Sequence, residues 1–322
     1  MRVIVIGAGA IGGWLAGTLA RGGAEVGLIA RGATLSHLRD TGLTLLEGDK
    51  RETLRLPAAE RLQDLPKADA VILAVKTYAF SDVVAQAAPA LTRGTLFVTA
   101  MNGLPWWFLA GVKGRLENQS LQCIDPGGKA AALLSDVRPA GAVVHVSARA
   151  EAPAVIRIAA VDRLILGEPD GKTSRALSAL GELVNAGGAR CDVVPDIRRE
   201  IWAKLWGNMN MNPVSALTRR TANGILGDAH LLQLVRDMMT EFAAVGARIG
   251  LPLPMTVDER LVVTRRLGDF RTSMLNDVET GRRIEIEALL GSVVELADKL
   301  GEPVPASRTV YALARTLNPE AH

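Results

Sequence analysis

Residues 2–21 read RVIVIGAGAIGGWLAGTLAR, and they combine the pattern of a strand with a glycine-rich turn. Its first part, RVIVIG, is a short β-branched run of the kind found in buried parallel strands. The pattern G-x-G-x-x-G follows at Gly7, Gly9 and Gly12. In such a turn the first glycine allows a sharp bend, the second lets the backbone approach a pyrophosphate, and the third lets a helix pack on the strand. The stretch therefore predicts a strand, a phosphate-binding turn and a helix whose N-terminus faces the phosphates.

The same uncharged run also has features of a secretory leader, because it follows a basic residue and contains small residues near its end. It contains five glycines, Gly7, Gly9, Gly12, Gly13 and Gly17. These glycines argue against a leader, since they would weaken a helix that has to insert as a unit. No other segment approaches the roughly 20 apolar residues needed to span a bilayer. We therefore expect a cytoplasmic protein that has no membrane partner.

The composition is that of an ordinary globular protein. The 322 residues are 48 % hydrophobic and 22 % charged, and this length suits two domains rather than one core. The net charge of +3 is small and spread along the chain, so a nucleic-acid partner is not expected. Cys123 and Cys191 have no second Cys or His at metal-ligand spacing, which argues against disulfides and metal sites and fits a reducing compartment.

The end of the second predicted strand indicates which dinucleotide is bound. The segment AEVGLIAR ends at Arg31, where a protein that binds NAD usually carries an acidic residue for the ribose 2′-hydroxyl. A guanidinium at this place suits a 2′-phosphate, which it can bind through two parallel hydrogen bonds. We therefore predict NADPH/NADP+ as the cofactor; the alternative is that Arg31 is a solvated loop residue.

Strand-like and helix-like segments alternate through the first half of the chain, which predicts an open sheet of parallel type. Further strands are expected within residues 67–76, 94–103, 140–150 and 152–160, and a β-hairpin is expected to turn at Gly48-Asp49. The segment LGEPDGKTS has the composition of a hinge, and the pattern beyond it is mainly helical. The predicted fold class is α/β, with a Rossmann-type dinucleotide-binding domain over residues 1–170 and a second, mainly α-helical domain over residues 171–322.

Two polar residues, Lys76 and Asn102, each follow a predicted strand directly. Ligands of open α/β sheets lie at the carboxyl ends of the strands, so we expect both side chains at the nicotinamide end of the crevice. The plainer interpretations are a surface lysine and a simple turn at Asn102-Gly103. His145 lies alone in a predicted strand and is more often a structural residue than a ligand.

The segment REIWAKLWGNMNMNPVSALT, residues 199–218, contains the sharper feature. Lys204, Asn208 and Asn212 are spaced i, i+4, i+8 and share one face of a helix. Asparagine is a mediocre helix former, and solvent-facing stripes usually carry charged residues, so we favour a functional face over a solvated one. Pro213 is expected to end or kink this helix.

A third polar segment, RTSMLNDVETGRRIEIEALLG, spans residues 271–291. Ser273 is a candidate helix cap. Glu285 stands between two isoleucines, which predicts partial burial and a functional pKa. The alternative is that Glu285 pairs on the surface with one of the two preceding arginines.

Together these segments resemble the ketopantoate reductases (2-dehydropantoate 2-reductases) over nearly the whole chain. The resemblance is carried by GAGAIGG, Arg31, AVK ending at Lys76, NG at Asn102, KLWGNMNMNPVSALT and SMLNDVETGRRIEIE. It implies that NADPH gives a hydride to the C2 ketone of a small-molecule 2-oxo acid, forming a 2-hydroxy acid. The substrate it favours is ketopantoate, which is reduced to pantoate in pantothenate biosynthesis.

The resemblance also implies a role for individual residues. Lys204 is the expected general acid that protonates the developing alkoxide, and Glu285 is expected to position the substrate and Lys204. Asn208, Asn212 and Ser273 match residues that hold the substrate's hydroxyl and carboxylate. The expected cofactor-binding residues are Gly7, Gly9, Ala10, Ile11, Gly12, Arg31, Lys76 and Asn102.

The chain departs from the family pattern beside Asn102. Met101 stands where Gln is common, and Pro105, Trp106 and Trp107 follow where many members have smaller or polar residues. The tryptophans either shape a pocket for a bulkier substrate or pack in the core, which leaves the identity of the 2-oxo acid open. Other readings are a paralogous reductase of another 2-oxo acid or ketone, an opine-type reductive condensation, and a non-catalytic NADP-binding sensor. A second copy of the chain is a candidate partner, as in a homodimer.

Overall fold

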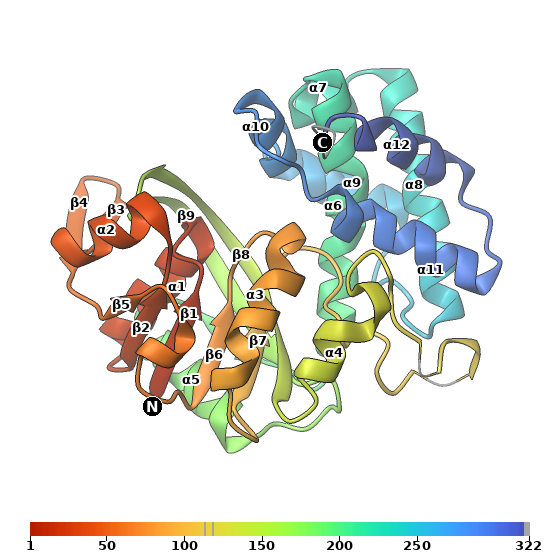
Figure 1. Cartoon of the computed structure of the whole chain (residues 1–322). Helices are drawn as coiled ribbons and strands as arrows, with labels where there is room; N and C mark the ends of the chain where they lie inside the picture. Colours follow the sequence, from red (N-terminus) through yellow and green to blue (C-terminus); the bar gives the residue numbers. More distant parts are fainter. Residues whose placement is uncertain (113, 118, 319–322) are drawn as a thin grey trace. The chain divides into compact units, whose positions relative to one another are not determined.

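The computed structural model describes residues 1–112, 114–117 and 119–318, and it divides into two compact units (Figure 1). Unit 1 comprises Met1–Met101 and Gly128–Ile197; unit 2 comprises Asn102–Gly127 and Arg198–His322. This division differs from the expected boundary between residues 170 and 171. The chain beyond residue 171 first returns to unit 1, because β10 pairs with β9 in parallel.

Unit 1 is built on one mixed sheet. Its described strands are β1 (Arg2–Ile6), β2 (Glu25–Ile29), β3 (Leu43–Glu47), β4 (Lys50–Leu54), β5 (Ala58–Ala59), β6 (Ala70–Leu73), β7 (Leu96–Thr99), β8 (Arg138–Ala152), β9 (Val155–Gly167) and β10 (Cys191–Val193). They lie in the order β4-β3-β9-β8-β7-β6-β1-β2-β5, with β10 beside β9. The neighbours β5, β2, β1, β6, β7 and β8 are parallel, as the sequence predicts. The β3–β4 and β8–β9 pairs are antiparallel, so the sheet as a whole is mixed.

Helices cover the faces of this sheet. They are α1 (Ala10–Arg21), α2 (Gly32–Asp40), α3 (Phe80–Ala87), α4 (Lys129–Leu133) and α5 (Arg175–Ala186). The core is apolar, and α1 contributes Trp14 and Leu15 to it. Small residues let α1 lie close to the strands, since a Cβ at Gly13 would lie 2.6 Å from Ile156. The glycine-rich composition of α1 is therefore needed for packing as well as for the turn before it.

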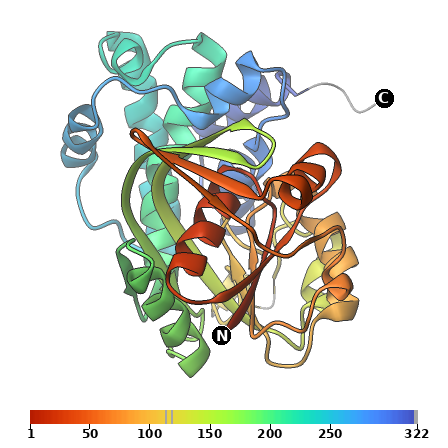
Figure 2. The same cartoon turned by 90° about the vertical axis from the view of Figure 1, so that its left-hand side faces the viewer.

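The β8–β9 hairpin extends far beyond the parallel strands. Figure 2 shows it beside the β3–β4 hairpin, and β3 pairs with the start of β9 from Thr44 opposite Val155. Its turn contains Ala154, which has a φ of 55°. His145 lies at a register shift of this hairpin and is partly buried. Residues 150–154, here called the hairpin tip, line the same cavity as Gly7 and Gly9 of the glycine-rich turn.

Unit 2 is mainly helical, as expected. From residue 197 onward its described helices are α6 (Ile197–Thr218), α7 (Ala222–Leu226), α8 (Ala229–Arg248), α9 (Val257–Arg266), α10 (Ser273–Glu279), a π-helix η6 (Glu287–Gly291), α11 (Ser292–Leu300) and α12 (Pro305–Arg315). In its core Trp202 stacks between Phe108 and Phe242, with ring centroids 6.0 Å and 3.9 Å apart. Among the described residues, no helix is long and apolar enough to cross a membrane.

Segment 102–127 belongs to unit 2 because its side chains and backbone are held there. The Phe108 carbonyl accepts a hydrogen bond from Arg198 Nε at 2.9 Å. The Glu295 carboxylate accepts from the backbone N–H groups of Gln122 and Cys123, at 2.7 and 2.9 Å. These are contacts between distant parts of the sequence, which local patterns do not reveal.

Candidate active site

The glycine turn has the geometry that its sequence predicts. Gly7 has a φ of +101°, and a Cβ on Gly12 would lie 1.7 Å from the Gly7 carbonyl oxygen. A Cβ on Gly9 would meet nothing within 4 Å. Gly9 is the N-cap of α1, and no side chain caps that end. The first and third glycines are therefore required by the fold, while Gly9 leaves open space in front of the helix N-terminus.

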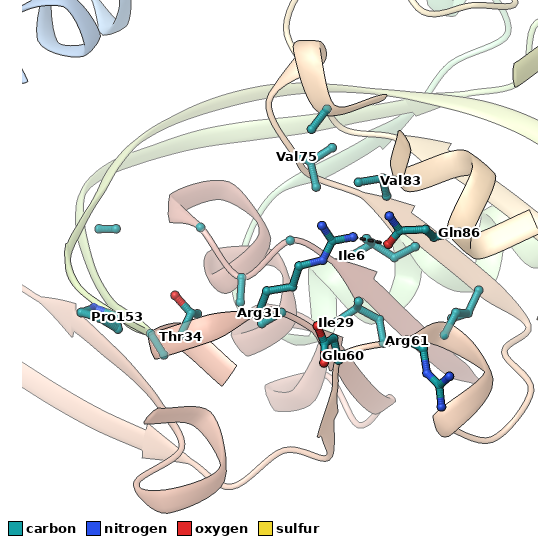
Figure 3. Close-up of a pocket in the computed structure, with 18 of the residues that line it drawn as sticks. Ile6, Ile29, Arg31, Thr34, Glu60, Arg61, Val75, Val83, Gln86 and Pro153 are labelled. Atoms are coloured by element: carbon teal, nitrogen blue, oxygen red, sulfur yellow. Dashed lines mark hydrogen bonds between the residues drawn. The ribbon is translucent and has the colours of Figure 1, made fainter. Parts of the chain in front are cut away.

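A cavity of about 480 Å³ opens beside this turn, at the carboxyl ends of β1 and β2 (Figure 3). Its lining includes Gly7 and Gly9, Arg31 and Thr34 at the start of α2, Gln86 on α3, and the hairpin tip. Figure 3 shows the Arg31 side chain reaching across the cavity, where its guanidinium donates a hydrogen bond to the side-chain amide oxygen of Gln86. The cavity thus joins a phosphate cradle to a cation that stands where a ribose 2′-substituent is expected.

Three of the predicted cofactor residues, Gly7, Gly9 and Arg31, line this cavity, and Ala10, Ile11 and Gly12 form the first turn of α1. Lys76 is partly buried and precedes a 3₁₀ turn, one residue after the lining residue Val75. Asn102 lies in unit 2. Prediction from the sequence missed Thr34, Gln86 and the hairpin tip. Thr34 follows Arg31 by three residues, so its place near Arg31 could have been predicted from the sequence. Gln86 and the hairpin tip reach the cavity only through the tertiary structure.

In unit 2, α6 carries the predicted polar face. Lys204 and Asn208 are partly buried, and Asn212 is buried. Burial lowers the pKa of Lys204 to about 8, and the negative charge of Glu285 opposes that change. The structure therefore brings Glu285 within electrostatic reach of Lys204. Of the two expectations for Pro213, an end of the helix is wrong, because α6 continues to Thr218; a kink stays a prediction.

Glu285 is buried, with 7 % of its surface exposed, between the buried Ile284 and Ile286. The backbone N–H of Ile284 donates to the Asn318 side chain at 2.7 Å, which fixes the segment before Glu285. Of the two preceding arginines, Arg282 forms its ion pair with Asp277 instead. The expectation of a buried carboxylate is confirmed.

The turn at Asn102-Gly103 packs directly against the segment that follows Glu285. Gly103 has a φ of +82°, and a Cβ there would lie 2.3 Å from the carbonyl oxygen of Ala288 in η6. Only a glycine allows this approach. Because Ala288 is three residues beyond Glu285, the structure brings the Asn102 turn and the Glu285 segment together within unit 2.

The structure corrects the expected helix cap and decides between the two alternatives for Trp107. Thr272, not Ser273, caps α10, since its hydroxyl accepts a hydrogen bond from the Leu275 N–H at 3.1 Å. Ser273 is exposed at the first position of the helix. Trp107 is 3 % exposed and packs edge-on against the partly exposed Trp106. Trp107 is therefore a core residue.

Comparison with protein families identifies the group to which this arrangement belongs. Residues 3–171 match the model described as "Ketopantoate reductase PanE/ApbA", and residues 196–318 match that of its C-terminal region. The chain belongs to the ketopantoate reductase family. The resemblance found in the motifs is thereby confirmed.

Relatives of this family match over the full length. A 2-dehydropantoate 2-reductase of Mesorhizobium japonicum is 40 % identical over 318 residues, which is 98 % of each chain. A solved structure from Ralstonia solanacearum, named as a candidate ketopantoate reductase, is 41 % identical with a TM-score of 0.92 and covers 98 % of this chain and 97 % of that one. D-Mandelate dehydrogenase bound to NADH and anilino(oxo)acetate is 18 % identical with a TM-score of 0.81 over 98 % of both chains, a similarity of fold alone.

Proposed function

We propose that this protein catalyses the NADPH-dependent reduction of a 2-oxo acid, with ketopantoate as substrate and pantoate as product. The observation that carries the proposal is that unit 2 places a partly buried Lys204 within the electrostatic influence of a buried Glu285. The full-length similarity to a 2-dehydropantoate 2-reductase supports the choice of substrate.

The residues of unit 1 fit a phosphorylated dinucleotide. The open space at Gly9 and the uncapped N-terminus of α1 suit a pyrophosphate. Arg31 suits the 2′-phosphate, with Thr34 one turn further along α2 as a second donor. When bound, NADPH supplies the hydride for the C2 carbonyl carbon. Lys76 and Asn102 remain proposed contacts of the cofactor.

Lys204 provides the proton for the carbonyl oxygen. With a pKa of about 8 the ammonium is largely protonated at neutral pH, yet it gives up its proton more readily than an ordinary lysine. Its positive charge also stabilises the alkoxide that forms as the hydride arrives. Glu285 keeps the ammonium charged against the effect of burial. Asn208, Asn212 and Ser273 supply uncharged hydrogen-bonding groups that orient the substrate.

The cellular setting follows from the same proposal. A biosynthetic reductase that consumes NADPH belongs in the cytoplasm, with the small-molecule acid as its partner. A homodimer is retained as a proposal.

The test is NADPH oxidation by the pure protein with a panel of 2-oxo acids that includes ketopantoate, each assayed with and without an added amine. We expect ketopantoate to be the best substrate and the amine to have no effect. Clear turnover of another acid without ketopantoate turnover would overturn the substrate. Turnover only with amine would indicate reductive condensation, and binding of NADPH without any turnover would indicate a sensor.

A variant tests the role of the lysine. Lys204→Ala is expected to lose most turnover while its affinity for NADPH is unchanged, because Lys204 lies in unit 2 and the proposed phosphate cradle lies in unit 1. The matched control is Lys172→Ala, which removes an exposed lysine from unit 1. Full turnover by Lys204→Ala would remove Lys204 from its role.

A further inference from the structure

A second cation lies against the polar face of α6. Arg260, on α9, extends its guanidinium onto Gly207: a Cβ at Gly207 would lie 2.5 Å from Arg260 Nη2 and 3.4 Å from its Cζ. The guanidinium thus occupies the space that the missing side chain of Gly207 leaves. The start of α9 is fixed by a capping box, in which Thr256 and Glu259 each accept a hydrogen bond from the other's backbone N–H.

Gly207 stands between two of the proposed active-site residues. It follows Lys204 by three positions and precedes Asn208 by one. The partly exposed positions of α6 in this stretch are 200, 203, 204, 207 and 208. Positions three and four apart share a helix face, so these residues form one open stripe. The Arg260 guanidinium therefore lies on the same open stripe that carries Lys204 and Asn208.

The Arg260 side chain has no partner within residues 1–112, 114–117 and 119–318. Its Nε is buried and finds no hydrogen-bond acceptor there. Four other arginines of unit 2 have ion-pair partners: Arg220 with Asp228, Arg236 with Asp258, Arg271 with Glu279, and Arg282 with Asp277. A buried donor without an acceptor costs stability. Arg260 as a whole is only partly buried, and its Nη2 lies over Gly207 at the open polar stripe. The terminal nitrogens of this guanidinium, rather than its buried Nε, are therefore placed to accept an anion that arrives from outside the chain.

We propose that Arg260 is a substrate-binding residue whose guanidinium holds the carboxylate of the 2-oxo acid. This inference rests on the proposed function. A guanidinium matches a carboxylate with two parallel hydrogen bonds. The positive charge of Lys204 is required at the ketone, and Asn208, Asn212 and Ser273 are uncharged. Arg260 is thus a second cation at this stripe, and it can take the negative charge of the acid.

Two variants test Arg260 from opposite sides. Arg260→Met removes the guanidinium and keeps an apolar side chain over Gly207. Gly207→Ala keeps Arg260 but places a methyl group where Nη2 now lies, which displaces the flexible end of the side chain. Alanine is also the better helix former, so Gly207→Ala should not lower the melting temperature. Both variants should raise the KM for ketopantoate by about 10- to 100-fold, as the loss of a charged hydrogen bond does, and should change kcat little.

The control is Arg265→Met, which removes an exposed arginine from the same helix; its KM should equal that of the wild type. The KM for NADPH should stay constant in all three variants. An unchanged KM for ketopantoate in Arg260→Met and Gly207→Ala would overturn the assignment. A rise in the KM for ketopantoate that comes with weaker NADPH binding and a lower melting temperature would also overturn it, because it would show a structural role. A failure of the Arg260 assignment can be told apart from a failure of the proposed reductase activity. In the second case the wild type itself would reduce no 2-oxo acid.

Discussion

Replacing Glu285 with glutamine should move the alkaline limb of the pH–rate profile to lower pH. The general acid must be protonated, so in the wild type kcat/KM should fall about tenfold per pH unit above the Lys204 pKa of about 8. A neighbouring negative charge favours the ammonium form. Removing that charge while keeping the shape of the side chain leaves burial unopposed, and the pKa of Lys204 must fall further.

The size of the pKa change at Lys204 can be worked out from the usual effect of a neighbouring charge. An opposite charge within contact range typically moves a pKa by about one to three units. With the smallest of these values the Lys204 pKa becomes about 7, and the protonated fraction at pH 7 falls from about nine-tenths to about one-half. At pH 9 it falls from about one-tenth to about one-hundredth. The activity of Glu285→Gln relative to the wild type should therefore be about five times lower at pH 9 than at pH 7. Any loss that does not depend on pH lowers both values equally and leaves this ratio unchanged.

The assay is kcat/KM for ketopantoate at saturating NADPH, measured between about pH 6 and pH 10 to cover both pKa values. Glu287→Gln is the matched control, because the Glu287 carboxylate interacts instead with the Tyr311 hydroxyl and with Arg315. Its alkaline limb should stay near pH 8. A limb that stays in place in Glu285→Gln, or that moves to higher pH, would refute the electrostatic coupling of Glu285 to Lys204.

Three further predictions concern residues at the proposed cofactor site of unit 1. Arg31→Ala should raise the KM for NADPH about tenfold or more and leave the KM for NADH unchanged, because only NADPH carries the 2′-phosphate. The control Arg51→Ala removes an exposed arginine of β4 that does not line the cavity, and it should change neither KM. Equal use of both cofactors by the wild type would contradict the assignment. Gly12→Ala should lower the melting temperature strongly, since its Cβ would lie 1.7 Å from a carbonyl oxygen of the turn. Gly9→Ala meets no protein atom within 4 Å, so calorimetry should show weaker NADPH binding and only a small change in melting temperature.

The parts of the fold that sequence patterns predict are those that local interactions determine. The strand, turn and helix around Gly7–Gly12 and the hairpin at Gly48-Asp49 depend on residues that are neighbours in the chain, and both appear in the structure. The pairing of Lys204 with Glu285 was reached through family resemblance, because no local pattern links residues 81 positions apart. No sequence pattern marks Arg260 for the same reason, because its place beside Lys204 and Asn208 depends on the contact of its guanidinium with Gly207.

Other differences have local causes that composition alone does not decide. Both Thr272 and Ser273 are good caps, and only the backbone geometry shows that Thr272 takes the role. Pro213 lacks one hydrogen-bond donor, and the α6 helix continues past it to Thr218 because tertiary packing outweighs that loss. Both elements belong to the well-packed interior of unit 2, where Val214 and Leu275 are buried.

The division of the chain has a consequence for anyone who wishes to study the two units apart. The backbone crosses between them after Met101, after Gly127 and after Ile197, so no single cut releases either one intact. A fragment that stops near residue 170 would retain Phe108 but lack Trp202, the ring on which Phe108 stacks, and would expose apolar surface prone to aggregation. To express each unit alone, its two segments have to be joined in one gene. Joining residue 101 to residue 128 gives unit 1, and joining residue 127 to residue 198 gives unit 2.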